Sequence, residues 1–368
     1  MKKLTLFALT FIVACTTPYS PTDRPSIEQQ GENREIIDYI DKRLSEEYYW
    51  LDEYVEKSGS FDRNMNWEQY LDRALLSLRS NADDGYINPR GERILYSYIR
   101  EISNSTLATQ SNGYGIVLYY TVVGVSSEDS NRLGFIVDYV YPETPAAEAG
   151  IERGDLILNV NSTDINRENY LTLFNTIQNS STTELSLNLY RPVLAGSSEA
   201  LLSCTMQRTS ISKNPIVHSE VIIPEGSSQR IGYLVYTGFD SEFNTALVDT
   251  MSEFEAAGIT HLIIDLRCNG GGSVSSAITL VSATLGRSYH DAVLCELRRN
   301  PRNTAVHNTS YCTLTEVGAS LGLSDVTIIC SENSASASEL VIEGLRGLDI
   351  PVHLIGSTTE GKNCGMDV

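Results

Sequence analysis

The stretch SENSASASELVIEGLRGLDIPVHLIGSTTEGK, residues 331–362, decides the fold because it places a strand-to-helix turn beside a second strand. The apolar residues 326–330 lead into it and are typical of a buried strand. After a polar break, leucine and valine recur at helical spacing, which predicts an amphipathic helix. Residues 351–355 are predicted to form a short strand, whose loop ends at Lys362.

The small residues of this turn can hold a serine hydroxyl in the open. Backbone N–H groups at the start of the helix lie beside it and favour negative charge there. A nucleophilic serine needs a base, and a lysine can act as one when desolvation lets it lose its proton near neutral pH. Small and apolar neighbours around Lys362 suit a lysine in an apolar pocket. The same residues alone are also typical of a polar helix cap and a surface turn.

Residues 356–362, GSTTEGK, also fit the pattern G-x4-G-K of a phosphate-binding loop. Asn363 stands where such a loop needs Ser or Thr to bind magnesium. The following residues are a poor start for a helix, so the pattern gives only weak support for a nucleotide site.

The composition bounds the class of protein. A length of 368 residues predicts two or three domains, and 41% hydrophobic residues suffice for real cores. The formal net charge of −20 argues against nucleic acid or an anionic membrane surface as a partner.

The N-terminal segment, from Met1 to Cys15, has the pattern of a targeting signal. A short basic start is followed by an apolar run, too short to span a bilayer, that ends in Ile-Val-Ala-Cys15. This pattern is typical of a bacterial lipoprotein signal and predicts that Cys15 is lipidated, which would anchor the protein to a membrane of the cell envelope, facing the periplasm or the cell surface. An ordinary secretory signal is the alternative. Residues 16–31 are then a linker, and no other segment reaches transmembrane length.

The other six cysteines, at positions 204, 268, 295, 312, 330 and 364, show no C-x-x-C motif and no metal-ligand spacing. The five histidines are scattered, so neither a metal nor another cofactor is expected. Cys295 and Cys312 flank a loop and can pair in an oxidising envelope. Buried free thiols are expected for Cys268 and Cys330.

Residues 32–104 have a helical pattern. Apolar residues recur at three- and four-residue steps from position 36 to 55, and residues 67–78 repeat this spacing. Residues 81–86 break the pattern as a turn. These residues predict a small helical domain whose simplest role is packing.

Short strands follow, at 113–118 and 133–140, and the next segment resembles a PDZ domain, placed at 111–205. A short helix opens at Pro145 and closes at Gly150, and Gly154-Asp155 leads into the next strand. PDZ domains bind an extended peptide by adding it to a sheet edge, with loop amides holding its terminal carboxylate. The resemblance implies these peptide-binding residues: Tyr114, Gly115 and Ile116 in the loop, and Val117 and Leu118 on the strand edge. The alternative is a PDZ domain that only packs against its neighbour.

The third region, residues 206–368, has an α/β pattern. Strand-like residues 231–239 precede an amphipathic helix at 241–257 and a buried strand at 261–267. The loop CNGGG, residues 268–272, then opens a helix at 273–284. Free backbone N–H groups at a helix N-terminus, and glycines that admit a substrate backbone, suit this loop to a site.

The order of PDZ-like segment, DLRCNGGG at 265–272, SASASE at 334–339 and the final Gly-Lys resembles the carboxyl-terminal processing (tail-specific) serine proteases. The family motif T-A-S-A-S-E implies Ser336 as the nucleophile, with Ser338 as the alternative, and Lys362 as the general base. The same resemblance implies an oxyanion hole formed by the N–H groups of Ala337 and Gly271. It also implies a crotonase-like α/β core, polypeptide substrates bound by their C-terminal tails, and no cofactor.

The sequence departs from the family in two ways. A glutamine often follows the lysine by four residues, and here that position is Met366. The sequence also stops six residues after Lys362, where the family continues with further strands. The expected fold is therefore an α/β multidomain protein whose protease core is incomplete at its C-terminus. A second hypothesis is a lipoprotein with a protease-like fold that binds peptide termini without cutting them.

Overall fold

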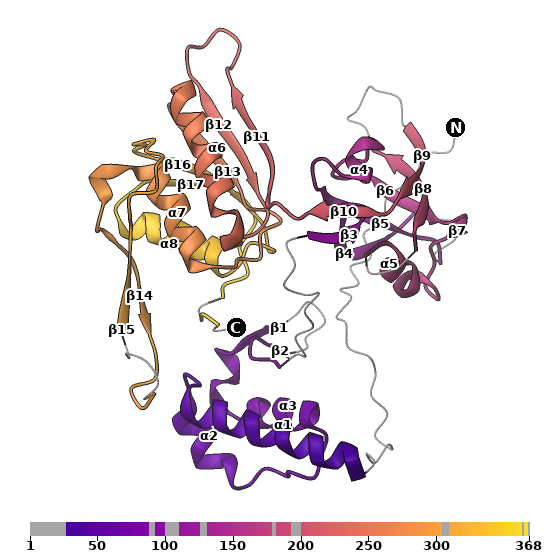
Figure 1. The fold of residues 1–368 in the computed structure, drawn as a ribbon, viewed down its shortest axis with the longest axis vertical. Coiled ribbons are helices and arrows are strands. Elements are labelled where there is room, and N and C mark those ends of the chain that lie inside the picture. The colour runs from indigo at the N-terminus through magenta and orange to yellow at the C-terminus, as the bar shows by residue number, and fades with distance from the viewer. Residues whose placement is uncertain are drawn as a thin grey trace.

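The computed structural model describes residues 27–87, 93–99, 110–125, 131–178, 182–192, 200–303, 309–362 and 364–366. Figure 1 shows three groups of elements along the chain: a helical group, a small antiparallel sheet with two helices, and an α/β core. Cys15, the predicted lipidation site, lies outside the described residues. Among the described residues, no helix is both long and apolar enough to cross a bilayer.

The helical group contains three helices and a small hairpin. The helices are α1 (Ile27–Glu46), α2 (Leu51–Ser58) and α3 (Trp67–Leu76), followed by a 3-10 turn (Arg79–Ala82) and strands β1 (Gly85–Ile87) and β2 (Arg93–Leu95). The apolar pattern predicted helix up to Val55 without a break. The chain instead turns at Trp50, which has φ −99° and ψ 35°, before α2 begins. Val55 is consequently exposed, and the hairpin is an addition that the helical pattern did not predict.

The middle group is an antiparallel sheet in the order β4-β5-β6-β8-β9. Its strands are β4 (Ile116–Gly124), β5 (Leu133–Val140), β6 (Leu156–Val160), β8 (Glu184–Arg191) and β9 (Ala200–Gln207), with β7 (Thr163–Asp164) paired to β6. The helices are α4 (Pro145–Glu148) and α5 (Tyr170–Gln178), and β3 (Gln110–Gly113) pairs with β10 (Thr209–Ser212). Because β4 pairs on one side only with another strand of the described residues, it is an edge strand there.

The α/β core is built on a five-stranded sheet in the order β11-β12-β13-β16-β17. Its strands are β11 (Ile216–Ile222), β12 (Ile231–Tyr236), β13 (His261–Asp265), β16 (Val326–Cys330) and β17 (Val352–Gly356). The other elements are α6 (Asn244–Ala257), α7 (Val274–Leu285), α8 (Ala337–Gly347), two 3-10 turns (Ser241–Phe243 and Arg287–Tyr289) and a hairpin of β14 (Val293–Arg298) and β15 (Thr309–Thr313). The last four strands of the sheet are parallel, so their carboxyl ends meet at one edge. The glycine loop and the serine turn both lie at this edge.

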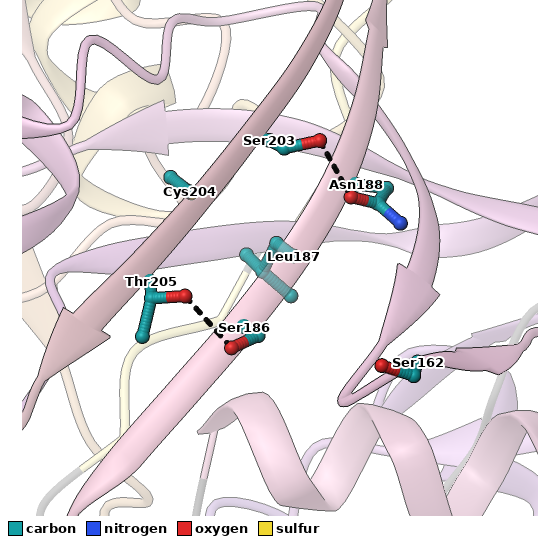
Figure 2. A pocket seen from close by; sticks show the side chains of 7 residues that line it. All are labelled: Ser162, Ser186, Leu187, Asn188, Ser203, Cys204 and Thr205. Atoms are coloured by element: carbon teal, nitrogen blue, oxygen red, sulfur yellow. Dashed lines mark hydrogen bonds between the residues drawn. The ribbon is translucent and has the colours of Figure 1, made fainter.

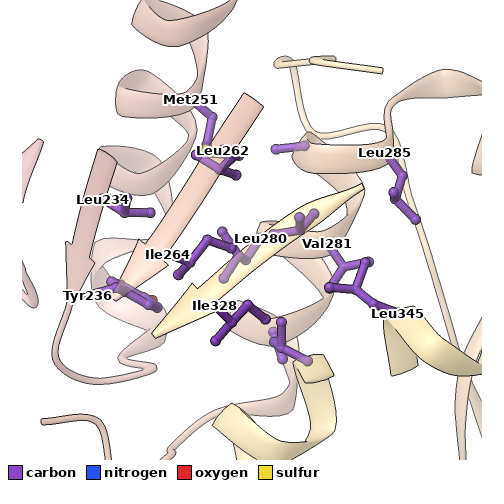
Figure 3. Packing of buried hydrophobic residues seen from close by; sticks show 14 of the residues in the cluster. Leu234, Tyr236, Met251, Leu262, Ile264, Leu280, Val281, Leu285, Ile328 and Leu345 are labelled. Atoms are coloured by element: carbon purple, nitrogen blue, oxygen red, sulfur yellow. The ribbon is translucent and has the colours of Figure 1, made fainter. Parts of the chain in front are cut away.

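Apolar side chains between the sheet and its helices hold this edge in place. Figure 3 shows Leu234, Ile264 and Ile328 from three neighbouring strands packed with Leu280 of α7 and Leu345 of α8. Each of these five side chains is at most 1% exposed. Burying an aliphatic side chain of this size contributes about 1.5–3 kcal/mol, so the strand ends that carry the site rest on a rigid base.

The last strand is less covered. Among the described strands, β17 pairs with β16 alone, which makes it the outer strand of this sheet. Leu354 is 41% exposed and Ile355 is 56% exposed. Because successive side chains of a strand point to opposite faces, both faces of the sheet are open at this edge.

Candidate active site

Ser336 stands at a strained turn between β16 and α8. It is the residue before the helix, and its backbone has φ 55° and ψ −111°. A non-glycine residue in such a conformation costs about 1–3 kcal/mol and persists only where the surrounding structure imposes it. Strand-to-helix turns of this sharp kind present a serine hydroxyl at the end of a sheet. The side chain of Ser336 is half-buried, as a nucleophile beside a substrate would be.

Gly271 makes room for this turn. Its φ is 103°, and a Cβ placed on it would lie 2.7 Å from Ser336 Cβ and 3.0 Å from Ala337 N. A side chain at position 271 would therefore meet the serine and the backbone at the helix start. The glycine loop and the serine turn are far apart in sequence, yet they are packed directly against each other.

The two predicted oxyanion-hole amides differ in the structure. Ala337 is the first residue of α8, where an N–H has no acceptor inside the helix, and within the described residues this N–H donates to no other group. The Gly271 N–H instead donates to Asn269 Oδ1 at 2.9 Å. The prediction of Gly271 as an oxyanion donor conflicts with this bond, because the amide is already engaged inside its own loop.

Asn269 fixes the glycine loop against the serine turn. Its side chain is fully buried and donates to the Tyr236 carbonyl at 2.9 Å. The backbone carbonyl of Asn269 accepts hydrogen bonds from the Ala335 N–H at 3.2 Å and from the hydroxyl of Ser338 at 2.8 Å. Ser338, the alternative nucleophile, is thus buried and hydrogen-bonded to backbone, which fits a packing role.

Glu339 is the residue that sequence reasoning missed. Its Oε2 accepts from the Ser336 N–H at 2.9 Å and from the Lys362 N–H at 2.9 Å. Its Oε1 accepts from the Gly361 N–H at 2.6 Å and from the hydroxyl of Thr359 at 2.7 Å. The signal was present as a capping box, the pattern S-x-x-E at a helix start.

This shared carboxylate brings the serine turn and the lysine loop together. The backbone nitrogens of Ser336 and Lys362 are close neighbours, since each lies 2.9 Å from the same Glu339 oxygen. Gly356, with φ 128°, allows the approach from β17, because a Cβ there would overlap the Cys330 carbonyl oxygen. The four-carbon stem of the lysine starts within reach of the serine.

The amine of Lys362, however, points elsewhere. Its Nζ lies 4.9 Å from the centroid of the Tyr96 ring, a cation–π contact with the segment after β2. Within the described residues, no hydrogen bond joins this amine to the hydroxyl of Ser336. The backbones of Ser336 and Lys362 therefore lie close together, but their side chains do not hydrogen-bond to each other.

The surroundings of the amine also differ from the apolar pocket that was predicted. Asp84 is buried, and burial raises the pKa of its carboxyl. Hydrogen bonds from Tyr48 and Ser97 and the charge of Lys362 partly offset that rise in pKa. The amine thus sits among an aromatic ring and a buried acid of the helical group. Met366, which stands in place of the family glutamine, is 42% exposed.

The predicted peptide-binding loop precedes the edge strand β4. Tyr114 is buried and donates its hydroxyl to the Thr182 carbonyl at 2.6 Å. Gly115 has φ 86°, and the Thr144 side chain fills the space that a Cβ would need. The remaining predicted residues, Ile116, Val117 and Leu118, begin β4.

One side chain covers part of this edge. Gln178, the last residue of α5, donates its side-chain amide to the Ile116 carbonyl at 3.1 Å. A peptide strand added here would compete with that bond. Tyr119, next along β4, donates its hydroxyl to Glu332 Oε1 at 3.0 Å, and Glu332 lies just before the serine turn. The edge strand and the turn are therefore joined by one hydrogen bond.

A pocket in the middle group is lined by residues of β8 and β9 and by Ser162 (Figure 2). Two hydrogen bonds, Ser203 to Asn188 at 2.7 Å and Ser186 to Thr205 at 2.9 Å, use its polar groups (Figure 2). It contains none of the predicted site residues, so it contributes nothing to the site. Among the described residues, no cluster of His, Cys, Asp and Glu is suited to hold a metal ion.

Two segments of the chain match models of known protein families. Residues 230–368 match the model of "Peptidase family S41", and residues 136–191 match that of the "PDZ domain". The chain combines an S41 peptidase domain with a PDZ domain. The predicted recognition of the carboxyl-terminal processing proteases and the predicted multidomain fold are confirmed.

Curated relatives agree at low identity. A chloroplastic C-terminal processing peptidase of Tetradesmus obliquus is 23% identical over 337 residues, which is 88% of this chain and 65% of that protein. The carboxy-terminal processing protease CtpA of Bacillus subtilis is 23% identical over 310 residues, which is 84% of this chain and 58% of that protein. The chain therefore spans about three fifths of the length of these relatives.

A solved structure shows the same fold. A crystal structure from Bacteroides fragilis NCTC 9343, assigned to the S41 proteases, superposes with a TM-score of 0.66 at 22% identity. The match covers 94% of this chain and 81% of that one. It extends over the helical group, the PDZ domain and the α/β core together.

Proposed function

We propose that this chain is a serine endopeptidase in which Ser336 is the nucleophile and Lys362 the general base. The observation that carries the proposal is the Glu339 carboxylate, which accepts backbone N–H groups from both residues. A carboxylate that fixes two loops far apart in sequence is a strong, charge-assisted arrangement. Its effect is to hold the serine turn and the lysine loop at one sheet edge.

The reaction requires a movement of one side chain. Lys362 leaves the Tyr96 ring and reaches Ser336, where its neutral amine takes the proton of the hydroxyl. The serine oxygen attacks a peptide carbonyl, and the Ala337 N–H stabilises the negative charge that develops on the carbonyl oxygen. The lysine then protonates the leaving amine, and water releases the acyl group. Gly271 could serve as the second oxyanion donor only after its amide leaves Asn269 Oδ1.

The proposed substrate is a polypeptide recognised through its C-terminal tail. The PDZ domain offers the edge strand β4 for strand addition, and the loop at Gly115 offers amides for a carboxylate. The Tyr119–Glu332 hydrogen bond links that strand to the residues before Ser336. A tail that displaces Gln178 from the Ile116 carbonyl would therefore lie on an element in contact with the serine turn.

The test is cleavage of an unstructured polypeptide by the full chain and its variants. Ser336→Ala is expected to abolish cleavage, because it removes the nucleophile. Ser288→Ala, an exposed serine in the same core, is the matched control and is expected to leave cleavage unchanged. Equal proteolysis by Ser336→Ala and the unmodified chain would reject the assignment.

One observation favours a second function, a peptide-binding protein without catalysis. The Lys362 amine lies on Tyr96 and not on Ser336. Such a protein would bind a peptide with a free C-terminal carboxylate and leave it intact. Binding of that peptide by calorimetry, with no cleavage products after long incubation, would favour this function over the peptidase.

We also propose that the chain is anchored in the cell envelope through lipidated Cys15. The support is the signal-like pattern from Met1 to Cys15. Metabolic labelling with a radioactive fatty acid should label the wild-type protein and leave the Cys15→Ser variant unlabelled. Label on Cys15→Ser would contradict the proposal.

A further inference from the structure

The hairpin of β14 and β15 joins two parts of the molecule (Figure 1). At its base, Leu294 packs against α8, where its side chain fills the space that a Cβ on Gly344 would need. Near its tip, Asn300 donates to the Tyr49 carbonyl at 2.7 Å and to Asp52 Oδ2 at 3.2 Å. The hairpin therefore connects the helix that begins after Ser336 to the start of α2.

Two cysteines face each other across this hairpin. Cys295 of β14 is the direct antiparallel partner of Cys312 of β15. Directly paired residues of an antiparallel ladder have Cα atoms about 4.5–5.5 Å apart, which falls inside the range of about 4.4–6.8 Å that a disulfide spans. Both residues are half-buried. The register of the hairpin, which has an irregularity between Val293 and Cys295, thus places the two cysteines where a cross-strand disulfide can form.

We propose that Cys295 and Cys312 are a modification site, a thiol pair that closes to a cross-strand disulfide when an external disulfide oxidises it. One thiolate attacks a sulfur of the oxidant, either a glutathione-type disulfide or a disulfide of a thiol oxidase, and displaces one thiol. The other cysteine then attacks the mixed disulfide and releases the second thiol. Two cysteine thiols are oxidised, one external disulfide is reduced to two thiols, and both protons leave with those products.

The pair stands apart from the other described cysteines. Cys204 and Cys330 lie on strands of different sheets, and Cys268 contacts Asp138 in the PDZ domain. All six described cysteines are free thiols in the structure, so this is the reduced form. The register brings only Cys295 and Cys312 opposite each other among the strand pairs of the described residues.

The environment sets the rate of the reaction. Burial, and then the hydrogen bond and charge of Cys312, raise the pKa of Cys295 to about 12. Since the thiolate is the reactive form, oxidation at neutral pH is slow and accelerates as the pH rises towards that value. We therefore expect the thiol pair to close quickly only with an enzyme or in an alkaline medium.

The consequence of closure is mechanical. The disulfide ties both strands beside Leu294, and so restrains the connection between α8 and α2. It also closes a short loop in the unfolded chain, and such loop closure is the usual origin of disulfide stabilisation. This inference does not depend on the peptidase proposal, because the thiol chemistry can be followed without any substrate.

The test uses the full chain, equilibrated in a glutathione redox buffer and then treated with an alkylating reagent under denaturing conditions. Arg298, Arg299 and Arg302 lie between the two cysteines, so trypsin separates them unless a disulfide holds the peptides together. The expected result is a linked peptide pair under non-reducing conditions, lost on reduction. It should be absent in Cys295→Ser and retained in Cys204→Ser, the control that removes an unpaired thiol.

A thermal scan provides the second measurement. Oxidation should raise the melting temperature of the core on the order of 5 °C, and Cys312→Ser should remove this difference. Alkylation of both Cys295 and Cys312 in a strongly oxidising buffer would overturn the proposal. Linkage of either residue to a different cysteine would overturn it equally.

Discussion

Replacing Glu339 by glutamine tests the account at the point where two loops are joined. The carboxylate of Glu339 accepts four hydrogen bonds, two on each oxygen, from Ser336, Thr359, Gly361 and Lys362. Glutamine has the same shape, but one of its two terminal atoms is an amide nitrogen, which donates and cannot accept. An amide nitrogen in place of Oε2 would face the Ser336 and Lys362 N–H donors, whereas in place of Oε1 it would face the Gly361 N–H donor alone, because the Thr359 hydroxyl can turn and accept from it. Glutamine is expected to adopt the second orientation, which loses one bond.

The magnitude follows from the one lost bond and from the weakening of the others, since hydrogen bonds to a charged acceptor are roughly twice as strong as those to a neutral one. A hydrogen bond to a charged group contributes about 1.5–3 kcal/mol, and the site is only half-buried, so the loss should be about 2–4 kcal/mol. This corresponds to roughly a 30- to 1,000-fold change in the opening of the lysine loop. A misplacement of about 1 Å between reacting groups is itself sufficient to lower a rate about 100-fold.

Two assays separate position from stability. Amide hydrogen exchange should show faster opening of residues 357–362 in Glu339→Gln, while the sheet core exchanges as before. The rate at which a fluorophosphonate labels Ser336 should fall by about 100-fold. The matched control is Glu343→Gln, one turn along the same helix, whose exposed pair with Arg346 at 2.8 Å should contribute less than about 1 kcal/mol.

Unchanged exchange in the lysine loop of Glu339→Gln would refute the reasoning, because the carboxylate would then not be holding the loop. Equal effects of Glu339→Gln and Glu343→Gln would refute it as well. The change would in that case be a general effect of lost charge on α8.

Three further results are expected. Gly271→Ala should lower the free energy of unfolding by several kcal/mol and prevent labelling of Ser336, because the added Cβ would lie 2.7 Å from Ser336 Cβ. Gly270→Ala is the control for urea unfolding and should behave as the wild-type chain, because no atom lies within 4 Å of its added Cβ. Asp84→Asn should become more stable relative to the wild-type chain as the pH rises above about 4, because burial raises the folded-state pKa of Asp84 and the wild-type chain therefore loses stability as the pH rises from the unfolded-state pKa to the folded-state pKa. Thermal melts of both chains at pH 4 and pH 7 measure the difference, and an equal difference at the two pH values would contradict the prediction. Tyr96→Leu removes the ring beneath the Lys362 amine and should speed fluorophosphonate labelling of Ser336 several-fold, on the order of the 0.5–2 kcal/mol of a cation–π contact; slower or equal labelling would show that Tyr96 does not restrain the lysine.

Local patterns predicted the elements of the core. The apolar residues 326–330 form β16 with those bounds, and the polar break after them contains the turn at Ser336. These features depend on periodicity, on chain-breaking residues and on small residues near one another in sequence. The parallel sheet then places the ends of β13 and β16 side by side, which is why the glycine loop and the serine turn could be expected to meet.

Long-range contacts explain what was not predicted. The Lys362 amine is drawn to Tyr96, which lies in a different group of elements and much earlier in the chain. The helix break at Trp50 depends on packing of the helical group, because the apolar pattern continues across it. The bond from the Gly271 amide to Asn269 is, by contrast, local: it is an Asx turn, which Asn commonly forms with the residue two positions on, and the motif comparison did not consider it.

The most direct test of the central claim is to locate the serine that reacts with a fluorophosphonate. The full chain is labelled, digested and analysed by mass spectrometry, beside Ser336→Ala and Lys362→Met. The account predicts one adduct, on Ser336, which is absent in the first variant and at least about 100-fold slower to form in the second. An unlabelled Ser336, or an adduct whose rate does not depend on Lys362, would contradict it.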